Sequence, residues 1–236
     1  MYLAKTNPTE RLRKPSKRAQ ETRQAIFSAA EQLFSERGFE GTGIRDIAAR
    51  AGVTGALVSF HGHSKRALFE YVVEARASEL SAAREAALEA ALAQEADLRA
   101  ILTCFIRPLL DRAMGDDPGW RAYARLIALI SADPQWRDLT SRCFDPTVAR
   151  FTRAIGARYP GATAENLSAG LVFSVSSMLA LCTSTWRIDA LAGRNPDTPG
   201  DSRTHIDALI TYAVAGLHAL GCCATARAPD GTGCCR

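Results

Sequence analysis

Apolar residues recur at intervals of three and four along almost the whole chain, and no convincing run alternates as a β-strand would. This spacing predicts an all-α protein. Glycines, prolines and polar clusters interrupt the pattern and divide it into nine segments. We therefore expect helices over residues 20–37, 44–51, 55–61, 65–93, 98–114, 120–131, 135–159, 163–192 and 202–220.

Two of these segments have unusual features. Asp145-Pro146 lies inside residues 135–159, where proline removes a backbone donor and is expected to kink or split the helix. Residues 65–93 begin apolar and end rich in Ala and Glu, as a connector between two parts would. The pattern predicts a basic disordered arm (1–19), an N-terminal head of short helices (20–70), a helical body (71–221) and a disordered tail (222–236).

Two short helices separated by Gly52 follow a longer amphipathic helix, which is the order of a helix-turn-helix. The last helix of such a unit enters the major groove, so its exposed residues must be small or polar. We expect Leu57 and Val58 to face the core. The exposed residues that meet this requirement are Thr54, Gly55, Ala56, Ser59 and His61.

Charge is unevenly distributed along the chain. Residues 1–75 hold 12 Lys and Arg against 8 Asp and Glu, whereas residues 76–236 hold 17 of each kind. All the net positive charge therefore lies in the N-terminal third, where it would attract a polyanion such as DNA.

The N-terminal third also resembles one known family. Thr22 to Phe39 is similar to the first helix of TetR-family DNA-binding domains, Ile44 to Thr54 to their second helix and turn, and Ala56 to Phe69 to their recognition helix and the start of the fourth helix. The resemblance covers about Thr22 to Val73 without a gap. It implies a transcriptional regulator, most simply a repressor that binds double-stranded operator DNA as a homodimer.

The resemblance also implies roles at matching positions. Some residues would contact phosphate and others the major groove. The implied phosphate contacts are Thr42, Arg45, His61 and Lys65, and the implied groove contacts are Thr54, Gly55, Ala56, Ser59 and Phe60.

Three positions depart from the family's pattern. Gly43 stands where a Thr would complete a capping box with Asp46, and Ser59 replaces a usual Tyr. Gly62-His63 stands where the family has Phe-Gly. Because that Phe packs into the head's core, we expect Gly62 to leave a gap there.

The family keeps its ligand cavity among the body helices, so some large side chains of the body are expected to line one. Few charges lie among them, which favours an apolar or aromatic ligand. The expected lining residues are Phe105, Trp120, Tyr123, Phe144, Phe151, Phe173 and Met178.

A dimer interface is expected on the last two helices, 163–192 and 202–220. Small residues would let the helices approach closely, and apolar ones would supply surface for a four-helix bundle. The alternative is that these faces pack inside the monomer. The expected interface residues are Ala169, Gly170, Val172, Val175, Leu179, Leu209, Val214 and Leu217.

The remaining chemistry offers little else. The chain has 7 cysteines, and the pairs Cys222-Cys223 and Cys234-Cys235 lack the spacing usual for zinc. Since no catalytic motif or signal peptide is evident, we expect a cytoplasmic non-enzyme with no metal, cofactor or membrane partner. Two alternatives stay open: a regulator without a ligand that recruits a protein partner, and a thiol- or metal-sensing regulator.

Overall fold

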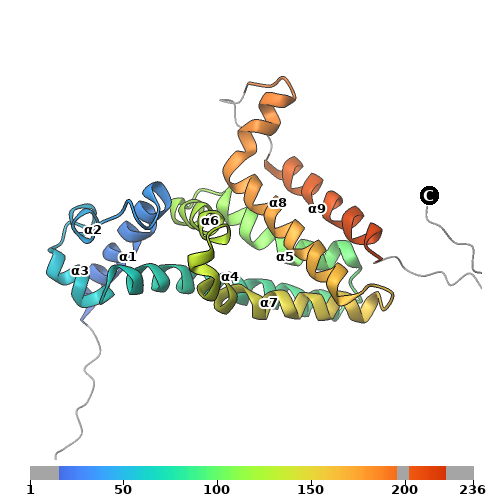
Figure 1. Cartoon of the computed structure of the whole chain (residues 1–236), viewed down its shortest axis with the longest axis horizontal. Coiled ribbons are helices and arrows are strands. Elements are labelled where there is room, and N and C mark those ends of the chain that lie inside the picture. The colour runs from blue at the N-terminus through green and yellow to red at the C-terminus, as the bar shows by residue number, and fades with distance from the viewer. Residues whose placement is uncertain (1–15, 196–201, 222–236) are drawn as a thin grey trace, which may run out of the picture.

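In the computed structural model, which describes residues 16–195 and 202–221, the secondary structure is helical (Figure 1). An all-α fold is thereby confirmed. The elements are α1 (Lys17–Arg37), α2 (Ile44–Ala51), α3 (Gly55–Gly62), α4 (Lys65–Leu92), α5 (Leu98–Ala113), α6 (Pro118–Ser131), the 3-10 turn η1 (Pro134–Trp136), α7 (Arg137–Arg158), α8 (Ala164–Leu191) and α9 (Ser202–Ala219).

Helix boundaries differ from expectation in three places. α1 begins at Lys17, where Ser16 caps it by accepting a hydrogen bond from Ala19 N, so residues 17–19 are helical and not part of an arm. Pro146 lies inside α7 without splitting it. The break occurs instead in α8, where Ser184 has non-helical dihedrals (φ −141°, ψ 24°).

The head consists of α1, α2, α3 and the first turns of α4. Its core side chains are fully buried because each lies on the inward stripe of an amphipathic helix. These side chains include Phe34, Ile47, Val58, Leu68 and Phe69.

The body contains the rest of α4 together with α5 to α9. α8 and α9 pack side by side, and a Cβ on Gly170 would lie 2.4 Å from Leu217. α8 is long and apolar enough to cross a membrane, with a mean hydropathy of 1.6, but here it packs against α6, α7 and α9.

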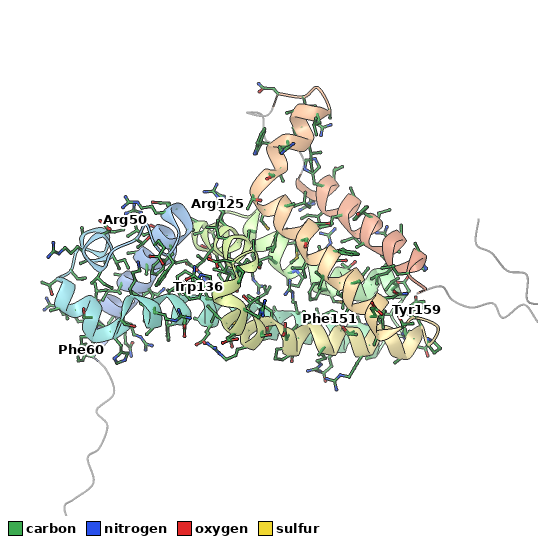
Figure 2. The ribbon with its side chains drawn as sticks, viewed as in Figure 1. Arg50, Phe60, Arg125, Trp136, Phe151 and Tyr159 are labelled. Atoms are coloured by element: carbon green, nitrogen blue, oxygen red, sulfur yellow. The ribbon has the colours of Figure 1, made fainter. Side chains whose placement is uncertain are left out.

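Head and body meet through aromatic and charged contacts. Trp136, labelled where the two parts join in Figure 2, packs against Phe69 with ring centroids 4.3 Å apart and against Phe39 at 5.0 Å. Beside them, Arg76 of α4 donates to both carboxylate oxygens of Glu31 on α1, at 2.9 and 3.1 Å. These contacts hold α1 against α4, and α1 also packs along α6.

Candidate DNA-binding head and ligand cavity

α2 and α3 form a helix-turn-helix whose turn is stabilised locally. Gly52 ends α2 in the left-handed conformation (φ 66°, ψ 32°), which glycine adopts without strain. The Thr54 hydroxyl caps α3 by accepting a hydrogen bond from Leu57 N at 3.4 Å. Val58 then points into the core, and Leu57, expected to do the same, is 40% exposed.

The outer surface of α3 carries the residues expected in the major groove. Thr54, Ala56 and Ser59 are exposed, and Phe60, labelled in Figure 2, is 74% exposed. A Cβ on Gly55 would meet no atom within 4 Å, so α3 begins with an open surface. This surface allows the approach of a base edge or phosphate, and the individual contacts stay predictions.

Thr42 and Arg45 occupy different environments, although both were expected to meet phosphate. Arg45 is exposed at the start of α2. Thr42 is 1% exposed, and its hydroxyl bonds the carbonyl oxygens of Gly38 at 2.9 Å and Leu33 at 3.1 Å. Because its side chain is enclosed by the head, Thr42 holds the loop between α1 and α2 and does not offer a hydroxyl to DNA.

His61 and Lys65 lie at the end of α3 and the start of α4. Both are half-buried. The Lys65 ammonium lies 4.2 Å from the centre of the Phe39 ring and 4.0 Å from the Glu40 carboxylate. These contacts hold the cation at the surface of the head, next to the N-terminus of α4, where an anion is favoured.

The turn between α3 and α4 contains no gap. Gly62 is buried, and a Cβ placed on it would lie 3.0 Å from Leu68 Cβ, so Leu68 already fills the space expected to be empty. His63 has φ 58° and ψ −63°, and Ser64 N donates to Gly62 O at 2.6 Å. This is a γ-turn of the rare, strained hand, centred on histidine.

The start of α2 lacks half of a capping box, as the sequence implies. Asp46 accepts a hydrogen bond from Gly43 N at 2.9 Å, and Gly43 has no side chain to return one. The backbone at Gly43 (φ −106°, ψ 156°) is one that Ser or Thr also adopts.

In the body, five helices enclose a cavity of about 310 Å³. Its wall is mostly apolar, with polar groups from Ser131, Thr140, Asp145 and Ser176. The remaining lining residues are Leu80 and Arg84 of α4, Phe105 and Leu109 of α5, Ile127 of α6, Phe144 and Val148 of α7, and Leu171, Val172, Val175, Met178 and Leu179 of α8.

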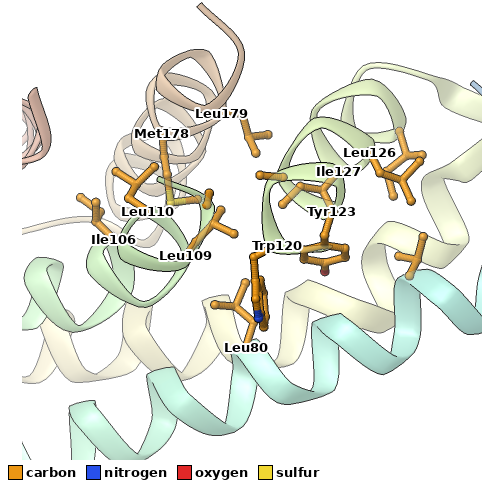
Figure 3. Close-up of a cluster of buried hydrophobic side chains, with 14 of the residues drawn as sticks. Leu80, Ile106, Leu109, Leu110, Trp120, Tyr123, Leu126, Ile127, Met178 and Leu179 are labelled. Atoms are coloured by element: carbon orange, nitrogen blue, oxygen red, sulfur yellow. The ribbon is translucent and has the colours of Figure 1, made fainter. Parts of the chain in front are cut away.

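Of the expected pocket residues, Phe105, Phe144 and Met178 line this cavity. The other four do not, for separate reasons. Figure 3 shows Trp120 and Tyr123 within the buried cluster of α4, α5, α6 and α8. Trp120 packs against the guanidinium groups of Arg76 and Arg112, Tyr123 is 0% exposed, Phe151 packs behind Phe105, and Phe173 is 59% exposed on the protein surface.

Most lining residues were not among those expected from the sequence, and the one charged residue that is buried among them is Arg84, which is 4% exposed. The signal was present, because Arg84 lies four residues after Leu80 and four before Leu88 on the buried stripe of α4. The Ala- and Glu-rich composition of that part of the helix indicates a connector and gives no sign of the cavity.

The expected dimer residues divide into two groups. Gly170, Leu179, Leu209 and Leu217 are buried within one protomer, so they offer little accessible surface to a partner. The others are at least partly accessible: Ala169, Val175 and Val214 are half-buried, and Val172 is 58% exposed. Val172 and Val175 also line the cavity.

Three cysteines fall within the described residues, and each is half-buried. Burial raises the pKa of Cys143 to about 11 and that of Cys182 to about 12, and it also raises the pKa of Cys104. These thiols are therefore protonated at neutral pH, where a reactive thiolate is scarce. The paired cysteines at 222, 223, 234 and 235 lie outside the described residues.

Comparison with known proteins agrees with this geometry. The family model "Bacterial regulatory proteins, tetR family" matches residues 26–72, and "Tetracyclin repressor-like, C-terminal domain" matches residues 103–216. The HTH-type transcriptional repressor BepR of Brucella suis biovar 1 (strain 1330) is 40% identical over 62 residues, which are 26% of this chain and 30% of that protein. The HTH-type transcriptional regulator AcrR of Shigella flexneri is 42% identical over 62 residues, 26% of this chain and 29% of that protein.

The match thus spans less than a third of each curated relative. A solved structure, a bacterial regulatory protein in the tetR family from Rhodococcus RHA1, superposes with a TM-score of 0.59 at 20% identity, covering 89% of this chain and 100% of that one. The head defines a helix-turn-helix DNA-binding protein. With both its head and its body matched by family models, the chain belongs to the TetR family of transcriptional regulators.

Proposed function

We propose that this regulator is a cytoplasmic repressor that binds operator DNA as a homodimer and is released when a small molecule occupies the cavity of the body. One observation carries this proposal: α4 and α6 belong both to the cavity wall and to the contacts with the head. Leu80 of α4 and Ile127 of α6 line the cavity, while Phe69 of α4 lies in the head core and α6 packs along α1.

The connection from cavity to head is short and built from packed elements. α4 is a continuous helix of 28 residues, so a displacement at Leu80 is transmitted toward Phe69. The Glu31–Arg76 pair and the Trp136 cluster hold α1 and α6 to the same helix. If the ligand in the cavity binds more tightly to the protein in one arrangement of its heads, it shifts the population toward that arrangement by the difference in affinity.

For the dimer we propose the outward faces of α8 and α9. Phe173 and Tyr212 are 59% and 66% exposed, so each presents a large apolar surface that a second protomer could cover. Small exposed residues on the same side of α9, Ala208, Ala215 and Gly216, would allow close packing. A two-fold pair of heads would match a palindromic operator.

The two alternatives are less well supported. A regulator without a ligand should have a filled body, whereas the cavity of about 310 Å³ falls in the range that small molecules use. A thiol sensor built on the body cysteines would need a thiolate, which the raised pKa values of Cys143 and Cys182 disfavour, whereas the paired cysteines at 222, 223, 234 and 235 lie outside the described residues.

Selection from a random duplex library tests the first half of the proposal. We expect a palindromic sequence to be enriched and its affinity to fall steeply with salt. Failure to enrich any sequence would overturn the proposal of operator binding.

A screen for compounds that raise the melting temperature of the protein tests the second half of the proposal. Such compounds should release the selected duplex. Ligands that bind without affecting DNA affinity would overturn ligand-operated release.

A further inference from the structure

Arg84 is a buried cation in a cavity wall that is mostly apolar and whose other polar groups come from Ser131, Thr140, Asp145 and Ser176. It shares the inward stripe of α4 with Ala77, Leu80 and Leu88, and is 4% exposed. Its Nε donates to the carbonyl oxygen of Phe105 at 2.8 Å, and its guanidinium lies 4.2 Å from the centre of the Phe105 ring. Arg84 is thereby fixed in one orientation at the cavity.

Among the residues that the structure describes, no carboxylate pairs with this guanidinium. Its Nη2 makes only a weak contact with Met178 Sδ at 3.6 Å, and Nη1 makes no hydrogen bond. Asp145 lines the cavity too, but it is exposed, accepts the Ser141 hydroxyl and forms no ion pair with Arg84.

The charge nonetheless persists at neutral pH. Burial lowers the pKa of Arg84 to about 10, which leaves the group protonated. A buried charge without a counterion is costly to fold, whereas an apolar side chain of similar volume would not be. A bound anion would offset this cost, since it would replace the water that the guanidinium loses.

A second donor lies nearby. The Tyr123 hydroxyl is buried without a hydrogen-bond partner in the described part of the chain, and it is close enough for the positive charge of Arg84 to influence its pKa. Tyr123 does not line the cavity itself. A phenolic hydroxyl both donates and accepts, so this unpaired group is compatible with an acceptor-bearing ligand but does not require one.

From this geometry we infer that the effector is an apolar molecule with one negative charge, most simply a monocarboxylic acid, whose anionic group pairs with Arg84. This inference rests on the proposed function, in which the cavity holds the effector. It also changes the expectation from sequence, which was of a largely apolar ligand. A single charge is required because the cavity offers one cation, and a second anionic group would be buried unpaired.

The test uses two fluorescent probes that share one ring system. Anilinonaphthalene sulfonate carries a single negative charge, and phenylnaphthylamine is the same molecule without the sulfonate. We expect the full-length protein to bind the anionic probe at least about tenfold more tightly than the neutral one, as a charge-assisted hydrogen bond to a buried guanidinium would give. Decanoate should displace the anionic probe more effectively than decanol.

Arg84→Gln removes the charge but keeps a donor for the Phe105 carbonyl, so it should abolish the preference for the anion. Arg153→Gln, the same change at an exposed site on α7, should leave the preference intact. Arg84→Lys keeps the charge and should retain part of the preference for the anion. This variant tests the inference even if Arg84→Gln does not fold. Equal binding of the two probes by the wild type, absence of binding, or a preference that survives in Arg84→Gln would each overturn the inference.

The same variants should be assayed for duplex binding without any ligand. Arg153→Gln, which lies outside the cavity wall, should bind the selected operator as the wild type does. Loss of operator selection by the wild type would count against the proposed function, whereas loss of probe discrimination alone would count against the assignment of Arg84.

Discussion

The head and the body place their functional residues in opposite ways. In the head, the proposed DNA surface comes from one short continuous stretch, between Arg45 and Lys65, on α2, α3 and the start of α4. In the body, the cavity is assembled from five helices, with lining residues as far apart as Leu80 and Leu179. A motif can therefore be recognised in the head, whereas the body's site depends on how its helices pack.

The same contrast appears in how well faces can be assigned. On α3, Val58 is buried and Phe60, two residues later, is exposed, so the inward and outward faces are distinct. α8 is apolar almost all round, so its stripes are not distinguishable by composition. There, Val172 lines the cavity although it was assigned to the interface, and Phe173 is on the surface although it was assigned to the pocket. A step of one residue turns a helix by about 100°, which exchanges the two roles.

The largest expected effect comes from the outward face of α8 and α9, the proposed dimer interface. Phe173→Glu or Tyr212→Glu should give monomers that stay helical, because both side chains are exposed in the protomer. Operator affinity should fall by about a hundredfold or more, since the second head no longer binds at high effective concentration. Light scattering and fluorescence anisotropy measure the two quantities.

Leu129→Glu provides the matched control, because Leu129 is 52% exposed on α6, outside the α8 and α9 surface. It should remain a dimer with wild-type affinity. If Phe173→Glu and Tyr212→Glu both remained dimers, the interface would have to lie elsewhere.

The second prediction concerns packing in the head. Gly62→Phe should lower the free energy of unfolding by about 1–3 kcal/mol, because its Cβ would crowd Leu68, which already occupies the space. Thermal or urea unfolding measures the change. Gly62→Ala adds only the Cβ and should cost less. Stabilisation by Gly62→Phe would show that the gap expected from the sequence exists.

Sequence reasoning succeeded where local chemistry decides the structure. Helix spacing and turn residues gave the order of the helices, and α2 begins and ends at the expected residues, Ile44 and Ala51. It failed where a long-range contact decides. The spacing of apolar residues does not show that carbonyl groups of α1 and the turn after it enclose Thr42. It also does not show that Leu68 fills the space beside Gly62. Arg84 is not among the expected pocket residues because the Ala- and Glu-rich composition of that part of α4 indicates a connector, and composition does not show which helices pack against it.

The third prediction tests whether Lys65 contributes equally to the binding of every DNA sequence. Lys65→Ala should weaken binding about tenfold for specific and random duplexes alike and reduce the salt slope by about one, as loss of a phosphate contact does. Arg153→Ala on the body should change neither quantity. If Lys65→Ala altered which duplex is preferred, its assigned role at the phosphate backbone would be wrong.

The smallest effect concerns the turn that joins the recognition helix to α4, where head and body begin to share a helix. His63 has a positive φ of 58° with ψ −63°, which is strained for a residue with a side chain. His63→Gly should raise the free energy of unfolding by about 1 kcal/mol, because glycine relieves this strain at some cost in chain entropy. His63→Ala, which keeps the Cβ, should bring no such gain, and calorimetry of the three proteins compares them. Since His63 is exposed and its ring belongs to no core contact, operator affinity should change little in His63→Gly. A fall in stability on introducing glycine would mean that the histidine side chain itself supports the turn.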